Sequence, residues 1–326
     1  MSSGRPPRNL AITGLGTFVG GRIAERLLEA DDGPRVIAID LDLPRRLEGR
    51  LPLHRVDLTE PTADSVVAEI LAKERCDALL HTAYFTDPHP DIEYAHELEM
   101  IGSLHVMNAT AAAGVPKLVV SSTAQVYGAR PDNPNFLDES HPLRPHQSAH
   151  QVCDRAEVES LLELFAERHP KQCVTSIRPC WVLGPTIESG ISRFFEASRL
   201  FVPLGYDPLM QVLHEEDLLR AVELALELDV PGPINLAGRG VLPLSTLVSL
   251  AGKSRWRLPP PLLYRLTSID WLRRTGDPPE AFYDYLRYLW TVDTRRAKEQ
   301  LGFEPEHTTK EAWMSFVVSK RLRKYR

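Results

Sequence analysis

The first half of the chain alternates between short apolar runs and longer segments in which apolar residues recur with helical spacing. Short apolar runs bounded by turn residues are typical of buried strands, and a repeat every three or four residues is typical of amphipathic helices. This alternation favours an α/β fold, with a parallel sheet covered by helices on both faces. The predicted strands are residues 10–13, 36–40, 53–56, 78–82, 118–121 and 174–177, and the clearest predicted helices are 22–30, 65–73, 94–113 and 155–168.

The pattern changes after about residue 180, where prolines become dense. The run Pro259-Pro260-Pro261 cannot lie inside a helix, because proline lacks the backbone N–H that a helix interior needs. A helical repeat at 216–228 is expected to return to the sheet. We therefore expect a doubly wound parallel sheet in residues 1–180, rejoined by 214–237, and a smaller, mostly C-terminal region in 181–213 and 238–326 that caps the strand ends and binds substrate.

A glycine-rich turn, residues 13–20 (Thr-Gly-Leu-Gly-Thr-Phe-Val-Gly), joins the first predicted strand to the first helix. Backbone N–H groups and the helix dipole make such a helix start an anion site, usually for a dinucleotide pyrophosphate. Asp40 ends the second strand, at the distance from which a carboxylate accepts the ribose hydroxyls of an adenosine. The carboxylate would repel a 2′-phosphate, which favours NAD over NADP, although Arg45 and Arg46 lie close by.

Composition narrows the classes of protein. Hydrophobic residues make up 43% and charged residues 25%, and the net charge of −6 gives no reason to expect nucleic acid as a partner. No apolar run reaches the length of a membrane span, and the short polar N-terminus does not read as a secretory signal. Four scattered cysteines are typical of reduced thiols in the cytoplasm. The acids of residues 214–217 favour a helix N-terminus rather than a metal site.

Further motifs follow the glycine turn in order. They are Asp57-Leu58, His81-Thr82-Ala83, residues 121–128 (Ser-Ser-Thr-Ala-Gln-Val-Tyr-Gly), Arg178-Pro179, Gly184-Pro185, residues 214–217, Asn235-Leu236-Ala237, and Asp293 with residues 301–305. With this ordered set the chain resembles, over nearly its whole length, the extended short-chain dehydrogenases/reductases of the NAD-dependent epimerase/dehydratase branch. The resemblance implies a Rossmann fold, NAD as cofactor and a small-molecule substrate.

The resemblance also implies site residues. Thr123 stands where the family places a Ser or Thr that hydrogen-bonds the reacting oxygen, and Asp57 and Leu58 would border the adenine. The side chain of Thr17 would crowd the approach of a pyrophosphate to the glycine turn and so reduce its affinity, unless the Thr17 hydroxyl donates a hydrogen bond to the pyrophosphate. The expected NAD-binding residues are Gly14, Gly16, Thr17, Phe18, Val19, Asp40, Asp57, Leu58, Thr82, Ala83, Ser121 and Pro179.

The proton-transfer pair of the family, Tyr-x-x-x-Lys, is missing at the expected place. Aligning residues 142–145 and Glu157 with the family pattern puts Ala149 at the Tyr position and Cys153 at the Lys position. Neither can transfer a proton as the phenol does or supply the positive charge of the lysine. His146 is the better-placed substitute base, because His150 would face away by about 100° around the helix. Tyr84 and Tyr127 are weaker candidates for a proton donor.

The substrate positions depart from the family pattern too. Trp181 and Met210 stand where nucleotide-sugar members carry an Asn and an Arg for the diphosphate, so a less anionic ligand is expected, unless both residues simply belong to the core. A tyrosine-rich helix is expected at 282–290, and Tyr84 is a further expected substrate contact.

Two functions remain open. One is an atypical oxidoreductase or epimerase acting on a secondary alcohol or sugar-type substrate. The other is a catalytically silent NAD-binding protein with a regulatory or partner-binding role. By resemblance, a homodimer through residues 94–113 and the helix after 147 is possible.

Overall fold

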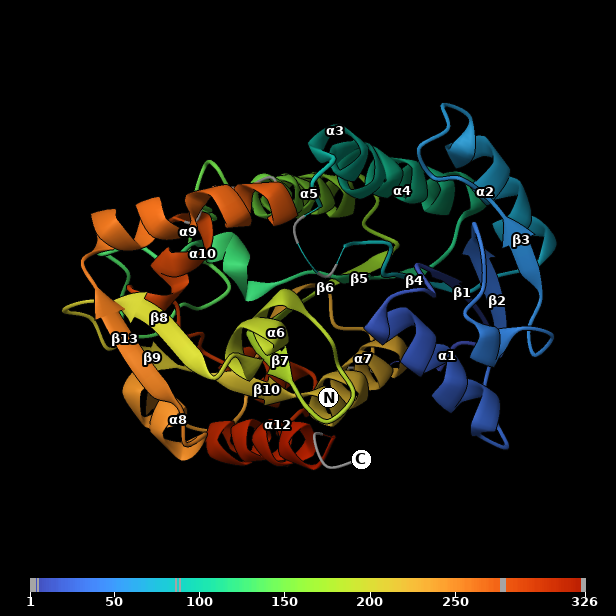
Figure 1. Ribbon diagram of the computed structural model, residues 1–326. Helices are drawn as coiled ribbons and strands as arrows, with labels where there is room; N and C mark the ends of the chain where they lie inside the picture. Colours follow the sequence, from blue (N-terminus) through green and yellow to red (C-terminus); the bar gives the residue numbers. More distant parts are fainter. Residues whose placement is uncertain (1–3, 5, 86, 88, 276–279, 324–326) are drawn as a thin grey trace.

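The computed structural model describes residues 4, 6–85, 87, 89–275 and 280–323, and a seven-stranded parallel sheet lies at its centre (Figure 1). All neighbouring strands in it are parallel. The predicted α/β doubly wound sheet is therefore confirmed, with strand ends within two residues of those expected. In spatial order the strands are β11 (Gly232–Leu236), β6 (Cys173–Pro179), β5 (Lys117–Ser121), β4 (Ala78–His81), β1 (Asn9–Thr13), β2 (Arg35–Asp40) and β3 (Leu53–Arg55).

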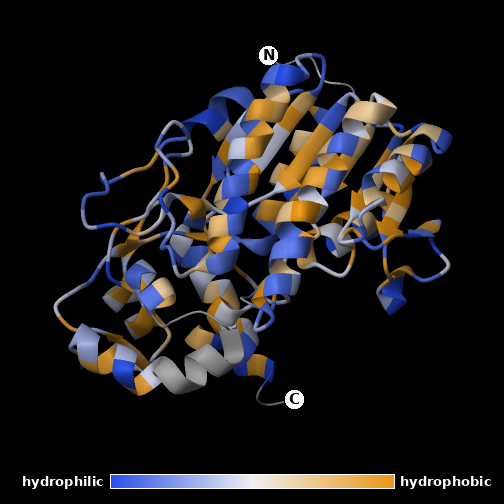
Figure 2. Cartoon of the chain, turned by 90° about the horizontal axis from the view of Figure 1, so that it is seen from above, coloured by the Kyte–Doolittle hydropathy of each residue, from blue (hydrophilic) through white to orange (hydrophobic). Residues whose placement is uncertain are grey.

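Helices cover both faces of this sheet (Figure 1). On one face α1 (Phe18–Glu29) packs against α7 (Glu215–Glu227), and on the other α2 (Ala63–Lys73), α4 (Gly102–Ala113) and α5 (His150–Arg168) lie side by side. Seen from above in Figure 2, the helices carry hydrophobic and hydrophilic residues in alternation, as expected where one side of a helix packs on a sheet.

The predicted helix at 94–113 is a composite. It consists of α3 (Ile92–His96), a π-helical turn η2 (Glu97–Ile101) and α4. Asp91 caps α3 by accepting a hydrogen bond from the backbone N–H of Tyr94, and Gly114 ends α4 with a positive φ of 66°. The π-helical turn has consequences for the site, because Glu99 lies on it.

The strand order creates a crevice at the carboxyl ends of β1 and β4. From β1 the chain runs outward to β2 and β3, then crosses to β4 on the other side of β1. The loops after β1 and β4 therefore leave in opposite directions, and ligands of open α/β sheets bind at such a switch point. Both strands are buried apart from Asn9, and they are apolar up to Thr13 and His81 at their ends, so the crevice has a rigid floor.

The remaining segments form smaller elements beyond the strand ends. Three two-stranded sheets pair β7 (Trp181–Leu183) with β10 (Val212–His214), β8 (Arg199–Pro203) with β13 (Ser254–Leu258), and β9 (Leu209–Met210) with β12 (Leu242–Pro243). The helices here are α6 (Gly190–Glu196), α8 (Leu244–Leu250), α9 (Pro260–Thr275), α10 (Glu280–Tyr283), α11 (Arg295–Gln300) and α12 (Thr309–Arg323). The division into a sheet domain and a capping region stays a prediction.

Two local expectations meet different outcomes. The proline run lies at the start of a helix, because α9 begins at Pro260, where a missing N–H costs nothing. The expected helix at 282–290 was wrong in extent: the chain forms the short α10 and a 3₁₀ turn, η4 (Asp284–Leu286), and leaves helical structure before Trp290. Two further 3₁₀ turns are η1 (Arg45–Leu47) and η3 (Ala124–Tyr127). Across the described helices, none combines the length and apolar character that crossing a membrane requires.

Candidate functional site

The glycine turn after β1 depends on close backbone approach. Gly14 has a φ of +76°, and a Cβ on it would lie about 2.4 Å from backbone atoms of Thr82 and Ala83. A Cβ on Gly20 would lie 2.4 Å from the carbonyl oxygen of Gly14. These glycines let α1 begin directly against the ends of β1 and β4. Gly16 differs, because a Cβ there would meet no atom within 4 Å and would point into open space.

Thr17 caps the helix that follows the turn. Its hydroxyl donates a hydrogen bond of 2.8 Å to the carbonyl of Gly14 and accepts one of 3.1 Å from the backbone N–H of Gly20. Both bonds hold the hydroxyl against its own turn. The first residues of α1, where a helix leaves backbone N–H groups without an intrahelical partner, lie at the crevice.

Asp40 lies at the end of β2, beside this turn. One carboxylate oxygen accepts a 2.7 Å hydrogen bond from the N–H of Leu15, and the other accepts a 2.7 Å bond from the N–H of Leu41. Burial raises the pKa of Asp40, and these backbone hydrogen bonds oppose that rise. The nearby Arg46 turns away, because its guanidinium pairs with Glu25 at 2.5 Å.

A cavity of about 360 Å³ opens over the turn and the ends of β2 and β3. Most of the residues expected to hold the adenosine half of a cofactor line it. They are Gly14, Gly16, Thr17, Asp40, Asp57, Leu58 and Ala83, together with Tyr84. The carboxylate of Asp57 accepts hydrogen bonds from both the N–H and the hydroxyl of Thr59, which fixes the loop after β3.

A second cavity of about 150 Å³ lies at the ends of β4, β5 and β6. It brings together Thr17, Phe18, Val19, Thr82, Tyr84, Ser121, Thr123, Pro179 and Trp181 from the sequence analysis. Thr123 begins η3, and its hydroxyl oxygen accepts a hydrogen bond from the N–H of Gln125. Ser122, Gln125, Arg155, Ile187 and Ser189 also line this cavity, and sequence reasoning missed them.

The first turns of α5 do not present the expected residues to this cavity. His146, Ala149 and Cys153 are absent from its lining. The thiol of Cys153 donates to the carbonyl of His146 at 3.3 Å, and the imidazole of His146 accepts from the N–H of Ser148. Arg155, two residues beyond Cys153, lines the cavity instead. Gln151 and Arg155 are four residues apart, as Ala149 and Cys153 are, but they lie on another side of the helix.

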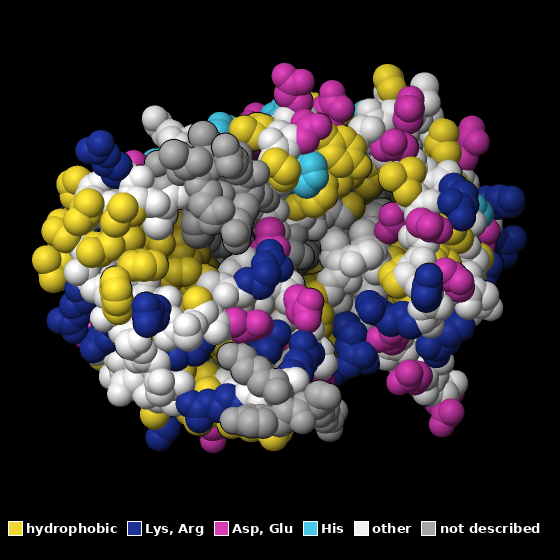
Figure 3. Space-filling view, in the orientation of Figure 1, with side chains coloured by type: hydrophobic (Ala, Val, Ile, Leu, Met, Phe, Trp, Pro, Cys, Tyr) yellow, Lys and Arg dark blue, Asp and Glu magenta, His cyan; other side chains and the backbone are white. Residues whose placement is uncertain are grey.

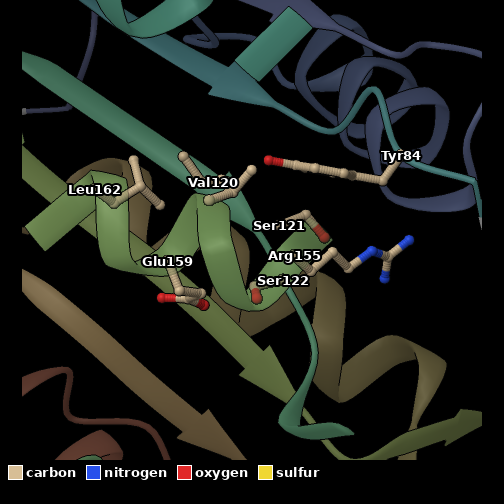
Figure 4. Close-up of a pocket in the computed structure, with 8 residues that line it drawn as sticks. Tyr84, Val120, Ser121, Ser122, Arg155, Glu159 and Leu162 are labelled. Atoms are coloured by element: carbon tan, nitrogen blue, oxygen red, sulfur yellow. The ribbon is translucent and has the colours of Figure 1, made fainter. Parts of the chain in front are cut away.

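Arg155 belongs to a buried polar cluster with Glu99. Its Nε donates a 3.3 Å hydrogen bond to one oxygen of the Glu99 carboxylate, and Gln151 donates a 3.1 Å bond to the other. The N–H of Phe85 also donates to this carboxylate, which is completely buried. Burial raises the pKa of Glu99, and the charge of Arg155 opposes the rise. In the close-up of Figure 4, Arg155 extends beneath the ring of Tyr84, 5.2 Å from its centroid.

A second buried pair explains the rotation of α5. Glu159 forms two hydrogen bonds to the guanidinium of Arg178 on β6, at 3.0 and 2.8 Å. Both residues are at most 2% exposed, whereas Glu157 is exposed. Because the buried Arg178 needs an acid beside it, Glu159 faces the sheet and Glu157 does not. The spacing Arg155-x-x-x-Glu159 was the sequence signal for this register.

The three residues expected to contact substrate differ in whether they line a cavity. Trp181 lines the second cavity and stacks on Phe282, with ring centroids 6.1 Å apart. Tyr84 lines both cavities, but its hydroxyl points inward to Ser103 at 3.0 Å, and burial raises its pKa. Met210 is fully buried in β9 and lines neither cavity, which agrees with the alternative that it belongs to the core.

The remaining candidates have structural partners. Tyr127 is buried and donates to Asn235 at 2.8 Å, and burial raises its pKa to about 12. His214 caps α7 and stacks on His307, with ring centroids 3.9 Å apart. Among the described residues, no group of three or more His, Cys, Asp or Glu side chains is arranged to hold a metal ion.

Known proteins resemble the chain in sequence and in fold. The uncharacterized protein Rv0501 of Mycobacterium tuberculosis is 29% identical over 329 residues, which span 97% of this chain and 85% of that protein. The UDP-glucose 4-epimerase of Thermotoga maritima, solved with UDP-glucose, superposes with a TM-score of 0.72 at 20% identity over 97% of this chain and 99% of that one. The Bacillus anthracis dTDP-glucose 4,6-dehydratase, solved with NAD, has a TM-score of 0.72 at 14% identity, with 97% of each chain covered.

A family model decides the classification. The model for the NAD dependent epimerase/dehydratase family matches residues 10–237, from the first strand of the central sheet to the residue after its last. The matched range includes the glycine turn, Asp40, Thr123 and the strand-end residues around both cavities. The chain belongs to the NAD dependent epimerase/dehydratase family.

Proposed function

We propose that the chain binds NAD across the two cavities, with the adenosine half over β2 and the nicotinamide half at the ends of β4 to β6. The observation that carries this proposal is the pairing of the glycine turn with Asp40 in one cavity. The open face of Gly16 leaves room for a pyrophosphate on the N-terminus of α1. The carboxylate of Asp40 can accept hydrogen bonds from ribose hydroxyls and would repel a 2′-phosphate. Arg46 pairs with Glu25 and is therefore not available to bind such a phosphate.

The chemistry that suits the second cavity is hydride exchange at a secondary alcohol carbon, of the oxidoreductase or epimerase type. NAD supplies the hydride acceptor when it is bound. We assign the substrate oxygen to Thr123, because its hydroxyl oxygen accepts from the N–H of Gln125 and its proton can be donated to a ligand. Arg155 brings a guanidinium to the same cavity, where its pairing with Glu99 holds it in place.

The cavity walls favour an uncharged or weakly anionic substrate of secondary-alcohol or sugar type. Trp181, Ile187 and Ile191 form apolar wall, and Ser122 and Ser189 add hydroxyl groups. The charge of Arg155 is largely balanced by Glu99, so little net positive charge remains for a diphosphate. The solved relatives carry nucleotide sugars in their names, and sugar-type alcohols are therefore the first substrates to test.

A second function, a catalytically silent NAD-binding protein, is favoured by the lining of the same cavity. No His, Asp, Glu or Lys is among the described residues that line it. Its titratable side chains are Arg155, the buried phenol of Tyr84 and Cys180, whose pKa burial raises to about 12. A positioned acid or base contributes about 10²–10⁴ in rate, so its absence predicts slow chemistry or none. His146 lies outside the lining, and we assign no proton transfer to it.

Two measurements test the proposal. Calorimetric titration of the purified chain with NAD, NADH and NADP should give saturable heat with NAD or NADH and weaker binding of NADP. Absorbance at the nicotinamide band, followed with a panel of secondary alcohols, sugars and nucleotide sugars, should then report turnover. Absence of any binding would overturn the proposal, and binding without turnover across the panel would select the silent function.

A further inference from the structure

A surface far from both cavities combines exposed apolar side chains with arginines. It is built by β8, β13, the loop after β8 and the first half of α9, and we name it the β13 surface. Trp256 is 48% exposed and Leu266 64%. In Figure 3, hydrophobic side chains gather at the left of the molecule over these elements, with Lys and Arg side chains beside them. Its residues are Arg199, Leu204, Tyr206, Arg255, Trp256, Arg257, Leu262 and Leu266.

The β13 surface is positively charged, whereas the whole chain carries a net negative charge. Residues 199–206 and 254–267 contain four arginines and no Asp or Glu, although the chain as a whole carries a net charge of −6. Arg199, Arg255 and Arg257 form no ion pair with any described residue, whereas arginines elsewhere, such as Arg144 and Arg220, pair with carboxylates. The positive charge of these three arginines has no acidic partner among the described residues, and such a charge favours an anionic partner outside the molecule.

Aromatic side chains accompany these arginines. The guanidinium of Arg199 lies 5.3 Å from the ring centroid of Trp256. The ring centroids of Trp256 and Phe201 are 5.8 Å apart. Leu262 and Leu266 are one helical turn apart on α9 and are both exposed, so they project from the same side of that helix. Side chains alternate along β13, so Arg255 and Arg257 project from the opposite side of the strand to Trp256, whereas Arg199 lies on the Trp256 side. Trp, Leu and Arg are residues that occupy the boundary between lipid headgroups and acyl chains.

We propose that the β13 surface docks on the surface of an anionic lipid bilayer. The guanidinium group of Arg199, which lies over the Trp256 ring, contacts headgroup phosphates, and Trp256, Leu262 and Leu266 enter the interfacial layer. A nucleic acid would satisfy the arginines but offers no apolar region to the two leucines. A bilayer receives both kinds of side chain at once.

Sedimentation with lipid vesicles tests this proposal on the full chain. Vesicles of phosphatidylcholine alone should not bind it, and vesicles with about a quarter phosphatidylglycerol should. Binding should weaken as salt rises from about 0.05 to about 0.5 M, because the Debye length shortens. Arg199→Gln should weaken partitioning about fivefold. Leu266→Gln and Trp256→Ala should weaken it at constant charge.

Matched controls lie at the other end of the molecule, beside β3 and α2 (Figure 1). Arg50 is exposed and forms no ion pair with a described residue, and Val66 is 41% exposed on α2, so Arg50→Gln and Val66→Gln should leave vesicle binding unchanged. All these positions are at the surface, and equal melting temperatures will show that each variant is folded. Equal binding to both kinds of vesicle, no binding to either, or equal effects of surface and control variants would overturn the proposal. A dimer in light scattering that Leu266→Gln dissociates, without vesicle binding, would assign the surface to a second copy and overturn it too.

Discussion

The Nε atom of Arg155 donates a 3.3 Å hydrogen bond to Oε2 of Glu99, and the carboxylate that accepts it is completely buried. The pair links α5 to the π-helical turn before α4 and sets the charge at the edge of the second cavity. Removing one partner leaves a buried charge uncompensated, which is much more costly than losing an exposed ion pair.

Arg155→Met should therefore lower the free energy of unfolding by about 3–5 kcal/mol. Arg193→Met is the matched control, because Arg193 pairs with Asp87 but is itself 59% exposed, and its loss should cost less than about 1 kcal/mol. Urea unfolding of both variants measures the difference. Adding Glu99→Gln to Arg155→Met should recover part of the loss, since the amide carries no charge to leave unpaired. Equal losses for Arg155 and Arg193 would contradict the assignment.

His81 should make stability sensitive to acid. Its imidazole is fully buried between Thr13 and Ser103, and burial lowers its pKa from 6.5 to about 3. As pH falls through about 6.5 the unfolded chain takes up this proton, but the folded protein does not until about pH 3. The contribution of His81 to stability is therefore complete above pH 6.5 and declines below it, by up to about 1.4 kcal/mol per pH unit.

Two measurements check that prediction. The nuclear magnetic resonance signals of the His81 ring should stay those of a neutral imidazole from pH 7 to about pH 4.5. Urea unfolding over the same range should show a shallower dependence on pH in His81→Gln than in the original chain. An imidazole that titrates near its ordinary pKa in the folded protein would rule the prediction out.

Two glycines of the same turn should respond differently to alanine. Gly14→Ala forces a side chain into a φ of +76° and against the backbone of Thr82, so it should cost stability, by about 1–3 kcal/mol. Gly16→Ala meets no neighbour within 4 Å and should fold normally. Its methyl group occupies the space proposed for the pyrophosphate, so NAD affinity should fall about tenfold or more. Thermal unfolding and calorimetry separate the two effects, and unchanged NAD binding in Gly16→Ala would place the pyrophosphate elsewhere.

Asp40→Asn should change cofactor preference. The amide oxygen can still accept a hydrogen bond from the N–H of Leu15 or Leu41, but the negative charge is gone. NAD should bind more weakly and NADP relatively better, because the repulsion of the 2′-phosphate is removed. Asp57→Asn, at the neighbouring strand end, is the control and should not shift the ratio. Calorimetric titration with both dinucleotides measures it, and an unchanged ratio in Asp40→Asn would remove Asp40 from the selection.

The strands and the glycine turn followed from local sequence. An apolar run such as residues 36–39 is buried on both faces in a parallel sheet, so its composition alone indicates its structure. The positions of Gly14 and Asp40 were likewise readable, because a strand, a tight turn and a helix place them at one sheet edge. The helix at 94–113 was located but not its π-helical turn, which no propensity distinguishes from ordinary helix.

The rotation of α5 and the fate of single apolar residues depended on the tertiary structure. Ala149 with Cys153 and Gln151 with Arg155 have the same spacing, and a shift of two residues turns a helix by about 200°. The buried Arg178 favours the second pair, because it pairs with Glu159 at the sheet. Trp181 and Met210 were equally apolar in sequence, yet one lines a cavity and the other is core. Sequence by itself determined the strand–helix order and the dinucleotide turn, which are local, whereas packing between distant segments decided which side chains face the site.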